Sequence, residues 1–196
     1  IAPLRGAGLP LHLTLGNHDN RERFWAGLTK EKSVQAPLAD RQVSVVRAER
    51  ANWFILDSLD KTNSTPGVLG PEQMQWLARA LDAHADRPAL VMVHHNPNTG
   101  GNKNGLTETE ALMEILRPRR QVKAHFFGHS HRWSIERDPS GIHLVNLPAT
   151  AYPFDKAQPA GWVAAKLEQS GMTLELRALD PSFPDHGKPK RLDWRA

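Results

Sequence analysis

The sequence predicts a layered α/β domain in which a second β-sheet is built late in the chain. Two observations carry this prediction. Apolar strand-like runs alternate with amphipathic helical segments up to residue 127, and strand-like segments then follow one another from 133 to 178. The alternating part is typical of a sheet covered by helices, and the uninterrupted strands favour an additional sheet. A chain of 196 residues is long enough to bury one substantial core.

The first half of the chain opens with an alternating apolar run that leads into a polar loop. Asp19 or Asn20 suits the N-cap of the short helix that follows, because a side-chain oxygen there accepts an unpaired helical N–H. Two β-rich runs then predict a hairpin, and a stretch rich in Ser, Thr, Asn, Pro and Gly predicts a surface loop. The expected elements are a strand at Leu11–Leu15, a helix at Glu22–Leu28, strands at Val43–Ala48 and Asn52–Asp57, and the loop at Ser58–Gly70.

The second half starts with a clear helix. Pro71 suits its first turn, and Met74, Leu77 and Leu81 fall on one face. The continuous apolar run at Ala89–Val93 predicts a strand that is buried on both faces. The remaining expected elements are a helix at Thr107–Leu116, strands at Val122–Phe127, Trp133–Glu136, Ile142–Leu147, Trp162–Glu168 and Met172–Ala178, and a surface extension at Pro181–Pro189.

Composition excludes several classes of protein and site. The net charge is +4, but the positive residues are scattered apart from a basic tail, and no aromatic side chains are interleaved with them. This pattern favours a solvated basic surface over nucleic-acid binding. The chain has no cysteine, so disulfides and thiolate metal sites are excluded, and it has no apolar run long enough to cross a membrane. Any metal must be held by His, Asp, Glu, Asn or water.

The strand expected at Val122–Phe127 leads directly into the sequence Gly128-His129-Ser130-His131. In an extended backbone residues i and i+2 project to the same side, so His129 and His131 are expected to direct both imidazoles at one point. Gly128 is expected where the chain turns, because a residue without a Cβ tolerates conformations that others avoid. With 10 histidines in the chain, one His-x-His pair needs partners before it indicates a metal site.

Two further strands end in polar clusters that contain histidine. Asn17-His18-Asp19 follows the first expected strand, and His94-His95 follows the buried one. Strand ends at one edge of an α/β sheet converge, and the crevice there is the usual place for a ligand. Together with the His129–His131 cluster they predict a metal site, whereas His12, His84, His125, His143 and His186 are expected to be ordinary exposed or hydrogen-bonded residues.

These three clusters, in this order, resemble the last three of five signature blocks of the calcineurin-like metallophosphoesterases. The resemblance extends to about Leu147. It implies an αββα sandwich with a two-metal centre at its edge, and a division into residues 1–180, the C-terminal portion of one such domain, and residues 181–196, a basic Pro-containing extension. The N-terminal part of the fold would then be missing from this chain.

The resemblance also implies roles for individual residues. Asn17, His94 and His129 would bind one metal ion and His131 the other, although the sequence leaves open whether His94 or His95 is the ligand. His18 would contact the phosphate or the leaving-group oxygen, with Asp19 orienting its ring. Two divalent metal ions are implied, and nitrogen and oxygen ligation without thiolate suits Mn, Fe or Zn.

The neutral character of these ligands indicates that the chain is the C-terminal portion of a longer protein. Asn and His cannot offset the charge of two divalent ions, so carboxylates are needed, one of them bridging. In the family they belong to an Asp-x-His block and a Gly-Asp block, and neither stands before Gly16 here. We therefore expect two of the five blocks to lie outside this chain.

Three functional hypotheses follow from these residues. The first is hydrolysis of phosphate mono- or diesters, in which metal-activated hydroxide attacks phosphorus and His18 assists the departing oxygen. The second is a non-catalytic binding or scaffold module with the same fold, because the carboxylates are absent, and the third is a mononuclear hydrolase. The expected partner is a small phosphate ester. The sequence leaves open which ester it is, the oligomeric state, and whether the protein is cytoplasmic or exported.

Overall fold

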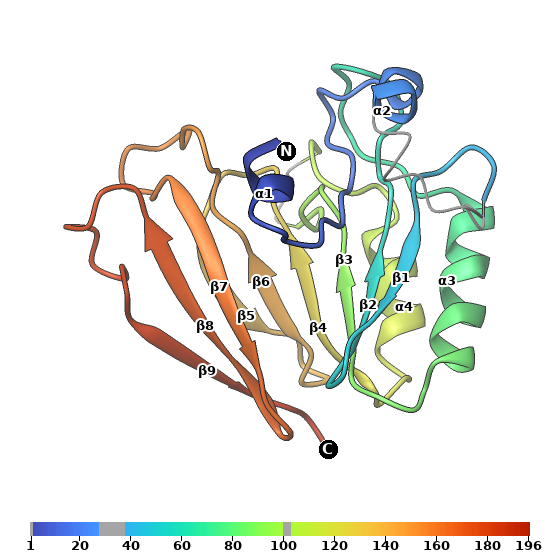
Figure 1. Ribbon diagram of the computed structural model, residues 1–196. Helices are drawn as coiled ribbons and strands as arrows, with labels where there is room; N and C mark the ends of the chain where they lie inside the picture. Colours follow the sequence, from blue (N-terminus) through green and yellow to red (C-terminus); the bar gives the residue numbers. More distant parts are fainter. Residues whose placement is uncertain (1, 28–37, 100–102) are drawn as a thin grey trace.

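The computed structural model describes residues 2–27, 38–99 and 103–196, which form two sheets and a layer of helices (Figure 1). Strands and helices alternate from β2 to β4, and strands follow one another from there. In chain order the elements are α1 (Ala2–Gly6), α2 (Arg21–Gly27), β1 (Ser44–Arg47), β2 (Asn52–Ile55), α3 (Pro71–Ala83), β3 (Ala89–Met92), α4 (Thr109–Leu116), β4 (Val122–Phe127), β5 (Ser134–Arg137), β6 (His143–Asn146), β7 (Gly161–Leu167), β8 (Gly171–Ala178) and β9 (Pro189–Asp193).

The first sheet has six strands in the order β1-β2-β3-β4-β6-β5. Neighbouring strands from β2 through β3 and β4 to β6 run parallel, and the two edge strands, β1 and β5, are antiparallel to their neighbours. The carboxyl ends of the four parallel strands therefore lie along one edge of the sheet. In such sheets the crevice at this edge is where ligands bind.

The two faces of the first sheet bury different sets of side chains. Along β3, Ala89 and Val91 pack with residues of α3 and α4, whereas Leu90 packs with residues of β8 and β9. This period-two alternation of fully buried residues explains why the run contains no polar side chain, as the sequence predicted. The helices on one side and the second sheet on the other give an α/β/β stack (Figure 1), in agreement with the predicted α/β class.

The second sheet is a three-stranded antiparallel sheet in the order β7-β8-β9. Its inner face contributes Met172, Leu174, Leu176 and Leu192 to the core between the sheets. Residues 181–188 are exposed or partly buried, and Phe183 among them packs against the core between the sheets. The chain then returns as β9 and pairs with β8, so the segment predicted as an extension adds a strand to this sheet.

The side chain of Arg195, beyond β9, is the anchor of this returning segment. Its guanidinium donates hydrogen bonds to the backbone oxygens of Leu116, Arg117, Arg119, Val122 and Ser140. Arg195 is 7% exposed, and these carbonyls include groups at the end of α4 that have no helical partner. Arg195 therefore attaches the C-terminal tail to the end of α4, the start of β4 and the backbone at Ser140.

Two predictions about strands are wrong. The alternating segment Leu11–Leu15 forms no strand; its hydrogen bond to β2's end comes from the Thr14 hydroxyl, which donates to the Leu56 carbonyl oxygen at 2.6 Å. The four strands expected between 133 and 178 do not form one antiparallel run, because β5 and β6 belong to the first sheet and β6 lies parallel to β4. The remaining elements are confirmed to within about two residues at their ends. The exception is the expected end of the helix Glu22–Leu28, because Leu28 lies outside the described residues.

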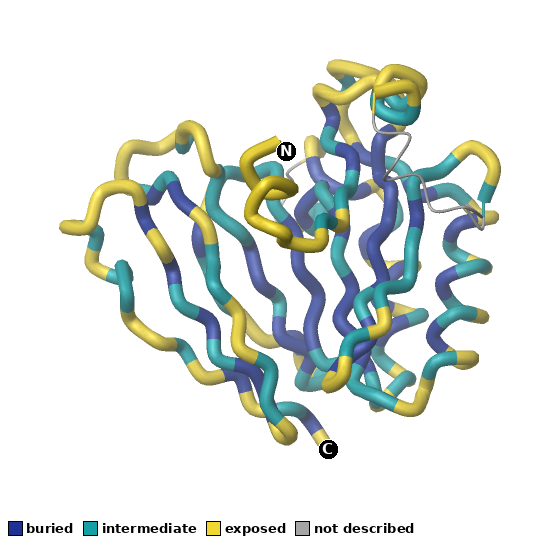
Figure 2. Tube along the Cα trace, in the orientation of Figure 1, coloured by how far each residue is buried: buried dark blue, intermediate teal, exposed yellow. Residues whose placement is uncertain are grey.

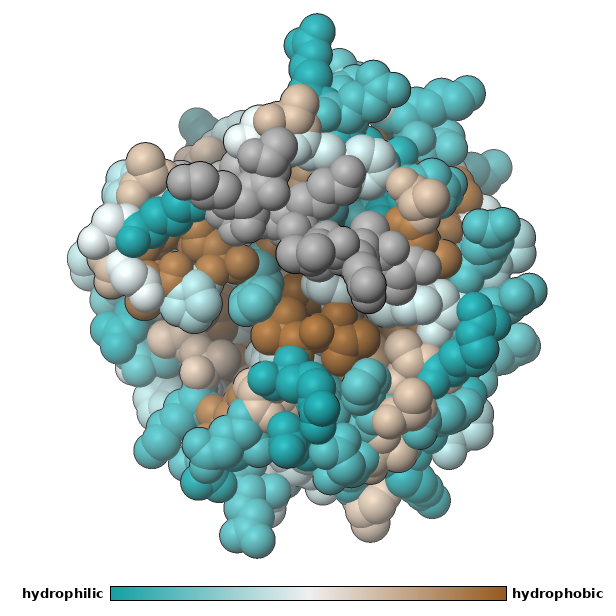
Figure 3. All heavy atoms as spheres, turned by 45° about the vertical axis from the view of Figure 1, so that its right-hand side comes forward, coloured by the Kyte–Doolittle hydropathy of each residue, from teal (hydrophilic) through white to brown (hydrophobic). Residues whose placement is uncertain are grey.

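Burial follows this layering. Figure 2 shows buried residues along the strands and on the inner sides of α3 and α4, while the segment around α1 is exposed. On the face in Figure 3 hydrophilic residues dominate, and hydrophobic residues gather in small areas. None of the helices that the structure describes has the length and apolar character of a membrane span.

Candidate metal centre

Polar residues collect where β2, β3 and β4 end at the same edge of the sheet. β2 is followed by Asp57 and Ser58, β3 by His94 and His95, and β4 by the segment 128–131. Since these strands are parallel and adjacent, their following residues are brought together although they are up to 74 residues apart in sequence, from Asp57 to His131. The predicted convergence of the clusters is confirmed for His94 and His129.

Three imidazoles form the centre of this edge. The ring centroids of His94, His95 and His129 lie 5.0, 5.2 and 4.6 Å apart in pairs, and one ligand nitrogen from each lies within 4.8 Å of the others. The side-chain oxygen of Asn17 is 3.1 Å from Nε2 of His94. Asn17 is therefore brought to the same point as the imidazoles. Four nitrogen and oxygen donors converge from three segments of the chain.

Burial keeps these imidazoles neutral. It lowers the pKa of His94 to about 4, and nearby His129, His131 and His18 add to the effect. Burial and the neighbouring His94 lower the pKa of His95 to about 3, and burial also lowers the pKa of His129. The neutral imidazole is the form that ligates metals. At neutral pH the cluster therefore presents lone pairs rather than positive charge.

The donor set fits one divalent cation. Imidazole nitrogen and amide oxygen without thiolate suit Mn, Fe or Zn. Among the residues that the structure describes, the histidine group includes no carboxylate, so these donors do not by themselves balance the charge of two ions. As predicted, the ligands supplied here are neutral.

His95 is held more tightly than the sequence suggested. It is fully buried, and its Nδ1 shares a hydrogen bond of 2.7 Å with Ser58 Oγ. A Cβ on Gly67 would lie 2.2 Å from the same Nδ1, so only glycine leaves room for the ring. Gly16 likewise leaves space for His94, because a Cβ on Gly16 would lie 3.0 Å from the His94 ring. The choice between His94 and His95 was open from the sequence; in the structure only His94 hydrogen-bonds Asn17, while Ser58 orients His95.

The backbone of the His129–His131 segment differs from the prediction. It is not extended: His129 and His131 have φ of 65° and 52°, in the left-handed region, and Gly128 does not. The two rings consequently face different neighbours. His129 joins His94 and His95, whereas His131 stacks on Phe154. Left-handed non-glycine residues are costly and gather at functional sites, so the turn is made by the histidines themselves.

The loop at Asn17–Asp19 is fastened to the loop after β2. Asn63 donates its backbone N–H to the Asn17 carbonyl oxygen at 2.6 Å, and its Oδ1 lies 2.8 Å from Nδ1 of His18. The expected contact from Asp19 to the His18 ring is wrong: the Asp19 carboxylate instead accepts the N–H of Gly16 at 2.7 Å, which closes the turn. His18 is exposed at the site edge and is oriented by Asn63.

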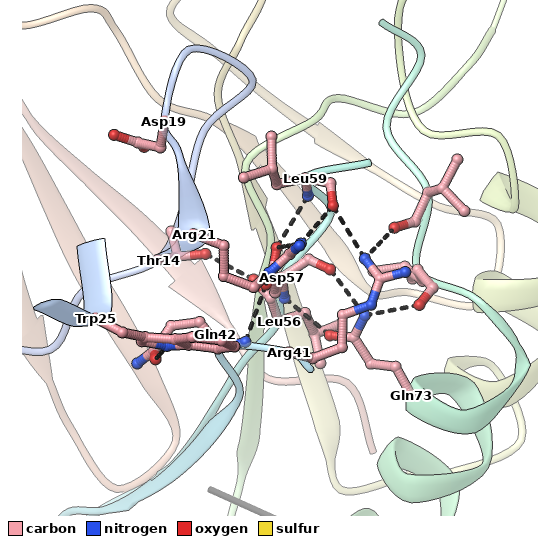
Figure 4. Close-up of polar contacts among 12 residues, drawn as sticks. Thr14, Asp19, Arg21, Trp25, Arg41, Gln42, Leu56, Asp57, Leu59 and Gln73 are labelled. Atoms are coloured by element: carbon pink, nitrogen blue, oxygen red, sulfur yellow. Dashed lines mark hydrogen bonds and ion pairs between the residues drawn. The ribbon is translucent and has the colours of Figure 1, made fainter. Parts of the chain in front are cut away.

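A buried ion pair fixes the start of α2 behind this loop (Figure 4). Asp57 is fully buried, and its carboxylate accepts Nε and Nη2 of Arg21 at 2.8 and 3.2 Å. It also accepts the backbone N–H groups of Gln42 and Leu59, so both oxygens are satisfied. Asn20 caps α2, as predicted, by accepting the N–H of Arg23 at 2.9 Å.

The family model for calcineurin-like phosphoesterases matches residues 2–133, which is most of the chain. The match includes all three histidine clusters. This chain belongs to the calcineurin-like phosphoesterase family.

This calcineurin-like phosphoesterase is similar in sequence to proteins that are named as cyclic nucleotide phosphodiesterases. It is 30% identical over 151 residues to the 3',5'-cyclic adenosine monophosphate phosphodiesterase CpdA of Pseudomonas aeruginosa, covering 74% of this chain and 51% of the relative. It is 27% identical over 144 residues to the 3',5'-cyclic-nucleotide phosphodiesterase alr5338 of Nostoc, covering 71% of this chain and 50% of the relative. The chain thus spans about half the length of these curated relatives.

A solved structure supports the fold. The structure of a dimetal phosphatase from Danio rerio superposes with a TM-score of 0.77 at 15% identity, covering 99% of this chain and 75% of that one. At this identity the likeness bears on the fold alone. It is consistent with the calcineurin-like arrangement of two facing sheets, in which the segments that carry Asn17, His94 and His129 meet at one edge.

Sequence reasoning missed four residues that shape this phosphoesterase site. Ser58 hydrogen-bonds His95, and Gly67 leaves space for the His95 ring. Asn63 orients His18, and Asp57 fixes the start of α2 through its ion pair with Arg21. All four lie in or next to the loop at 58–70, which the sequence marked only as a surface loop. Its richness in Ser, Thr, Asn, Pro and Gly was the available signal.

Proposed function

We propose that the protein containing this chain is a metal-dependent phosphodiesterase that acts on cyclic nucleotides. The observation that carries the proposal is the convergence of Asn17, His94 and His129 at the carboxyl edge of the sheet in a calcineurin-like phosphoesterase. The cyclic-nucleotide class is supported by the relatives, which are named as cyclic nucleotide phosphodiesterases. Phosphate monoesters are the second substrate class that such a site accommodates.

Asn17, His94 and His129 would hold a divalent metal ion, and His131, which adjoins the same edge, would bind a second one. When bound, the metal supplies Lewis-acid activation of the phosphate and of the attacking water. The chain's own contribution is to keep these donors neutral and in place. Burial does the first, through the lowered pKa of His94 and His129, and the backbone hydrogen bond from Asn63 to Asn17 contributes to the second.

His18 would act on the leaving group. Its Nδ1 faces the Oδ1 of Asn63, an acceptor, so the proton resides on Nδ1 in the neutral ring and Nε2 is left for the substrate. In the doubly protonated ring Nε2 also carries a proton, which it would donate to the departing ester oxygen and so stabilise the charge that develops there. Because His18 is exposed while its ring is anchored at one nitrogen, it is both accessible and oriented.

The direct test is the hydrolysis of 3',5'-cyclic AMP and bis(p-nitrophenyl) phosphate by the full-length protein with added Mn. We expect His18→Ala to lower kcat by about 100- to 10,000-fold, as for loss of a general acid, and Asn17→Ala to weaken metal binding measured by calorimetry. His12→Ala, at an exposed histidine outside the cluster, is the matched control. Unchanged rates in His18→Ala and unchanged metal affinity in Asn17→Ala would refute the assignment.

A non-catalytic binding module is the second candidate. It is favoured by one observation, that the histidine group includes no carboxylate among the described residues. Metal titration of the full-length protein separates the two, because a catalytic centre requires stoichiometric binding of metal and a scaffold does not. Absence of binding together with absence of hydrolysis would favour the scaffold.

A further inference from the structure

Two large aromatic side chains stand exposed beside the metal centre. Tyr152 is 58% exposed and Phe154 is 68% exposed, and both lie in the segment between β6 and β7. Neither belongs to the two apolar cores. Large apolar rings in contact with water are unfavourable, and this chain does not bury them in its cores.

Both rings nevertheless pack against the imidazole of His131. Phe154 stacks face to face on the imidazole of His131, with centroids 4.0 Å apart and planes at 2°. Tyr152 meets the same imidazole edge to face at 5.1 Å, and meets Phe154 at 5.9 Å and 74°. The two aromatic rings are thus fastened to a residue of the site, and one face of Phe154 is covered by His131.

Phe154 also lines a pocket of about 550 Å³ that reaches the metal centre. The same pocket is lined by His129, one of the converging imidazoles, and by Arg132, Asn96 and Asn146. Its volume is in the range of small-molecule sites, which are typically apolar with a few placed polar groups. The pocket therefore has a reactive end at His129 and an aromatic wall at Phe154.

We propose that Phe154, supported by Tyr152, is the platform on which the nucleobase of the substrate stacks while its phosphate lies at the metal centre. The inference rests on the proposed function and adds its substrate-recognition element. A planar base on Phe154 would continue the stack begun by His131, and His131 links that stack directly to the catalytic edge. Offset stacking at ring separations of about 4.5 to 7 Å is the usual geometry for aromatic pairs.

The character of the surroundings favours a small heteroaromatic ring over a protein or lipid surface. The pocket lining carries an arginine, three asparagines, a glutamate and a histidine, which suits a ligand with polar edges. Every base has a π-face, so stacking alone tolerates different bases and depends on ring area. The platform therefore predicts a preference for purine over pyrimidine cyclic nucleotides, with little discrimination between adenine and guanine.

The test compares two substrates that differ only in the base. With the metal-loaded full-length protein, kcat/KM is measured for 3',5'-cyclic AMP and for 1-deoxyribose 3,5-cyclic phosphate, in which hydrogen replaces the base and the 2-hydroxyl is kept. Phe154→Ala is expected to lower kcat/KM about 5- to 150-fold for cyclic AMP, the range for loss of one base–aromatic stack, and to leave the base-free substrate unchanged. Phe154→Trp should retain activity on cyclic AMP.

The control is Trp162→Ala, which removes an aromatic side chain that is 55% exposed on β7 and is no part of the pocket lining. Equal losses on both substrates would overturn the platform, because they would show that Phe154 only supports His131. No loss on either substrate would overturn it as well.

A binding measurement separates this inference from the proposed function. Calorimetric titration with adenosine 5'-monophosphate and with ribose 5-phosphate requires no turnover. Weaker binding of the nucleotide alone in Phe154→Ala supports the platform even if the wild-type protein hydrolyses neither cyclic substrate, an outcome that would refute the proposed function only. Equal affinity of wild type and Phe154→Ala for the nucleotide would refute the platform.

Discussion

Gly67→Ala tests how the loop at 58–70 controls the imidazole cluster. The new Cβ would lie 2.2 Å from Nδ1 and 2.4 Å from Cγ of His95, against an ordinary contact of at least 3.4 Å. Gly67 has no left-handed φ, so alanine is conformationally permitted and the effect is steric alone. The ring must therefore shift by about 1 Å, and this changes its position relative to His94 and His129, whose centroids are 5.0 and 4.6 Å away.

Displacement of this size has two expected consequences. Overpacking a tight interior typically costs about 1–3 kcal/mol of stability, here increased by loss of the Ser58 hydrogen bond to His95. A shift of about 1 Å in a catalytic constellation typically costs about 100-fold in rate. We therefore expect kcat/KM to fall by about two orders of magnitude and the metal affinity to weaken.

The assay is a double-mutant cycle in the full-length protein, with urea unfolding, metal titration and kcat/KM measured on each variant. In a His95→Ala background there is no imidazole for the new Cβ to meet, so adding Gly67→Ala should lower stability and kcat/KM little further. Gly27→Ala is the control, because no atom of the residues that the structure describes lies within 4 Å of its Cβ position. If Gly67→Ala is equally damaging with and without the His95 ring, the steric reasoning is refuted.

Three further predictions concern stability, measured by urea unfolding. Arg195→Ala removes donors to five backbone oxygens and should lower the free energy of unfolding by about 3 kcal/mol; a loss below about 1 kcal/mol would contradict this anchor. Asp57→Ala should cost about 3 kcal/mol, and less when Arg21→Met is already present, because the ion pair is buried; additive losses would argue against coupling. Burial lowers the pKa of His125 to about 4, so its neutral form is required for folding and stability falls as pH drops below about 6.5. His125→Leu should remove about 2 kcal/mol of that loss of stability at pH 5. Parallel plots of unfolding free energy against pH for the wild type and the variant would refute this prediction.

The clusters at the strand ends were predictable because their signal is local. A continuous apolar run such as Ala89–Val93 marks a strand buried on both faces, and the residues after it must lie at the sheet's edge. Parallel packing of β3 and β4 then brings His94 and His129 together. The fold class followed from the same periodicity, since the order of strands and helices is written along the chain.

The remaining features depend on contacts between segments that are far apart. Ser58 and His95 are separated by 37 residues and Asn63 and His18 by 45, so no local pattern announces either hydrogen bond. The left-handed backbone of His129 was hidden because glycine next to it is the residue that ordinarily adopts that conformation. At Leu11–Leu15 the alternation was real, but alternation does not specify a partner strand.

The loop at 58–70 and the segment at 150–158 differ in a way that matters for engineering. The first touches Asn17, His18 and His95 at once, so exchanging it would disturb every part of the centre together. The second presents Tyr152 and Phe154 outward, and its attachments include the ring contacts with His131 and the backbone N–H of Trp133, which donates to Gln158. Libraries that probe the proposed base platform should therefore diversify 152 and 154 and leave the earlier loop intact, so that base selectivity is varied while the contacts that place Asn17, His18 and His95 are kept.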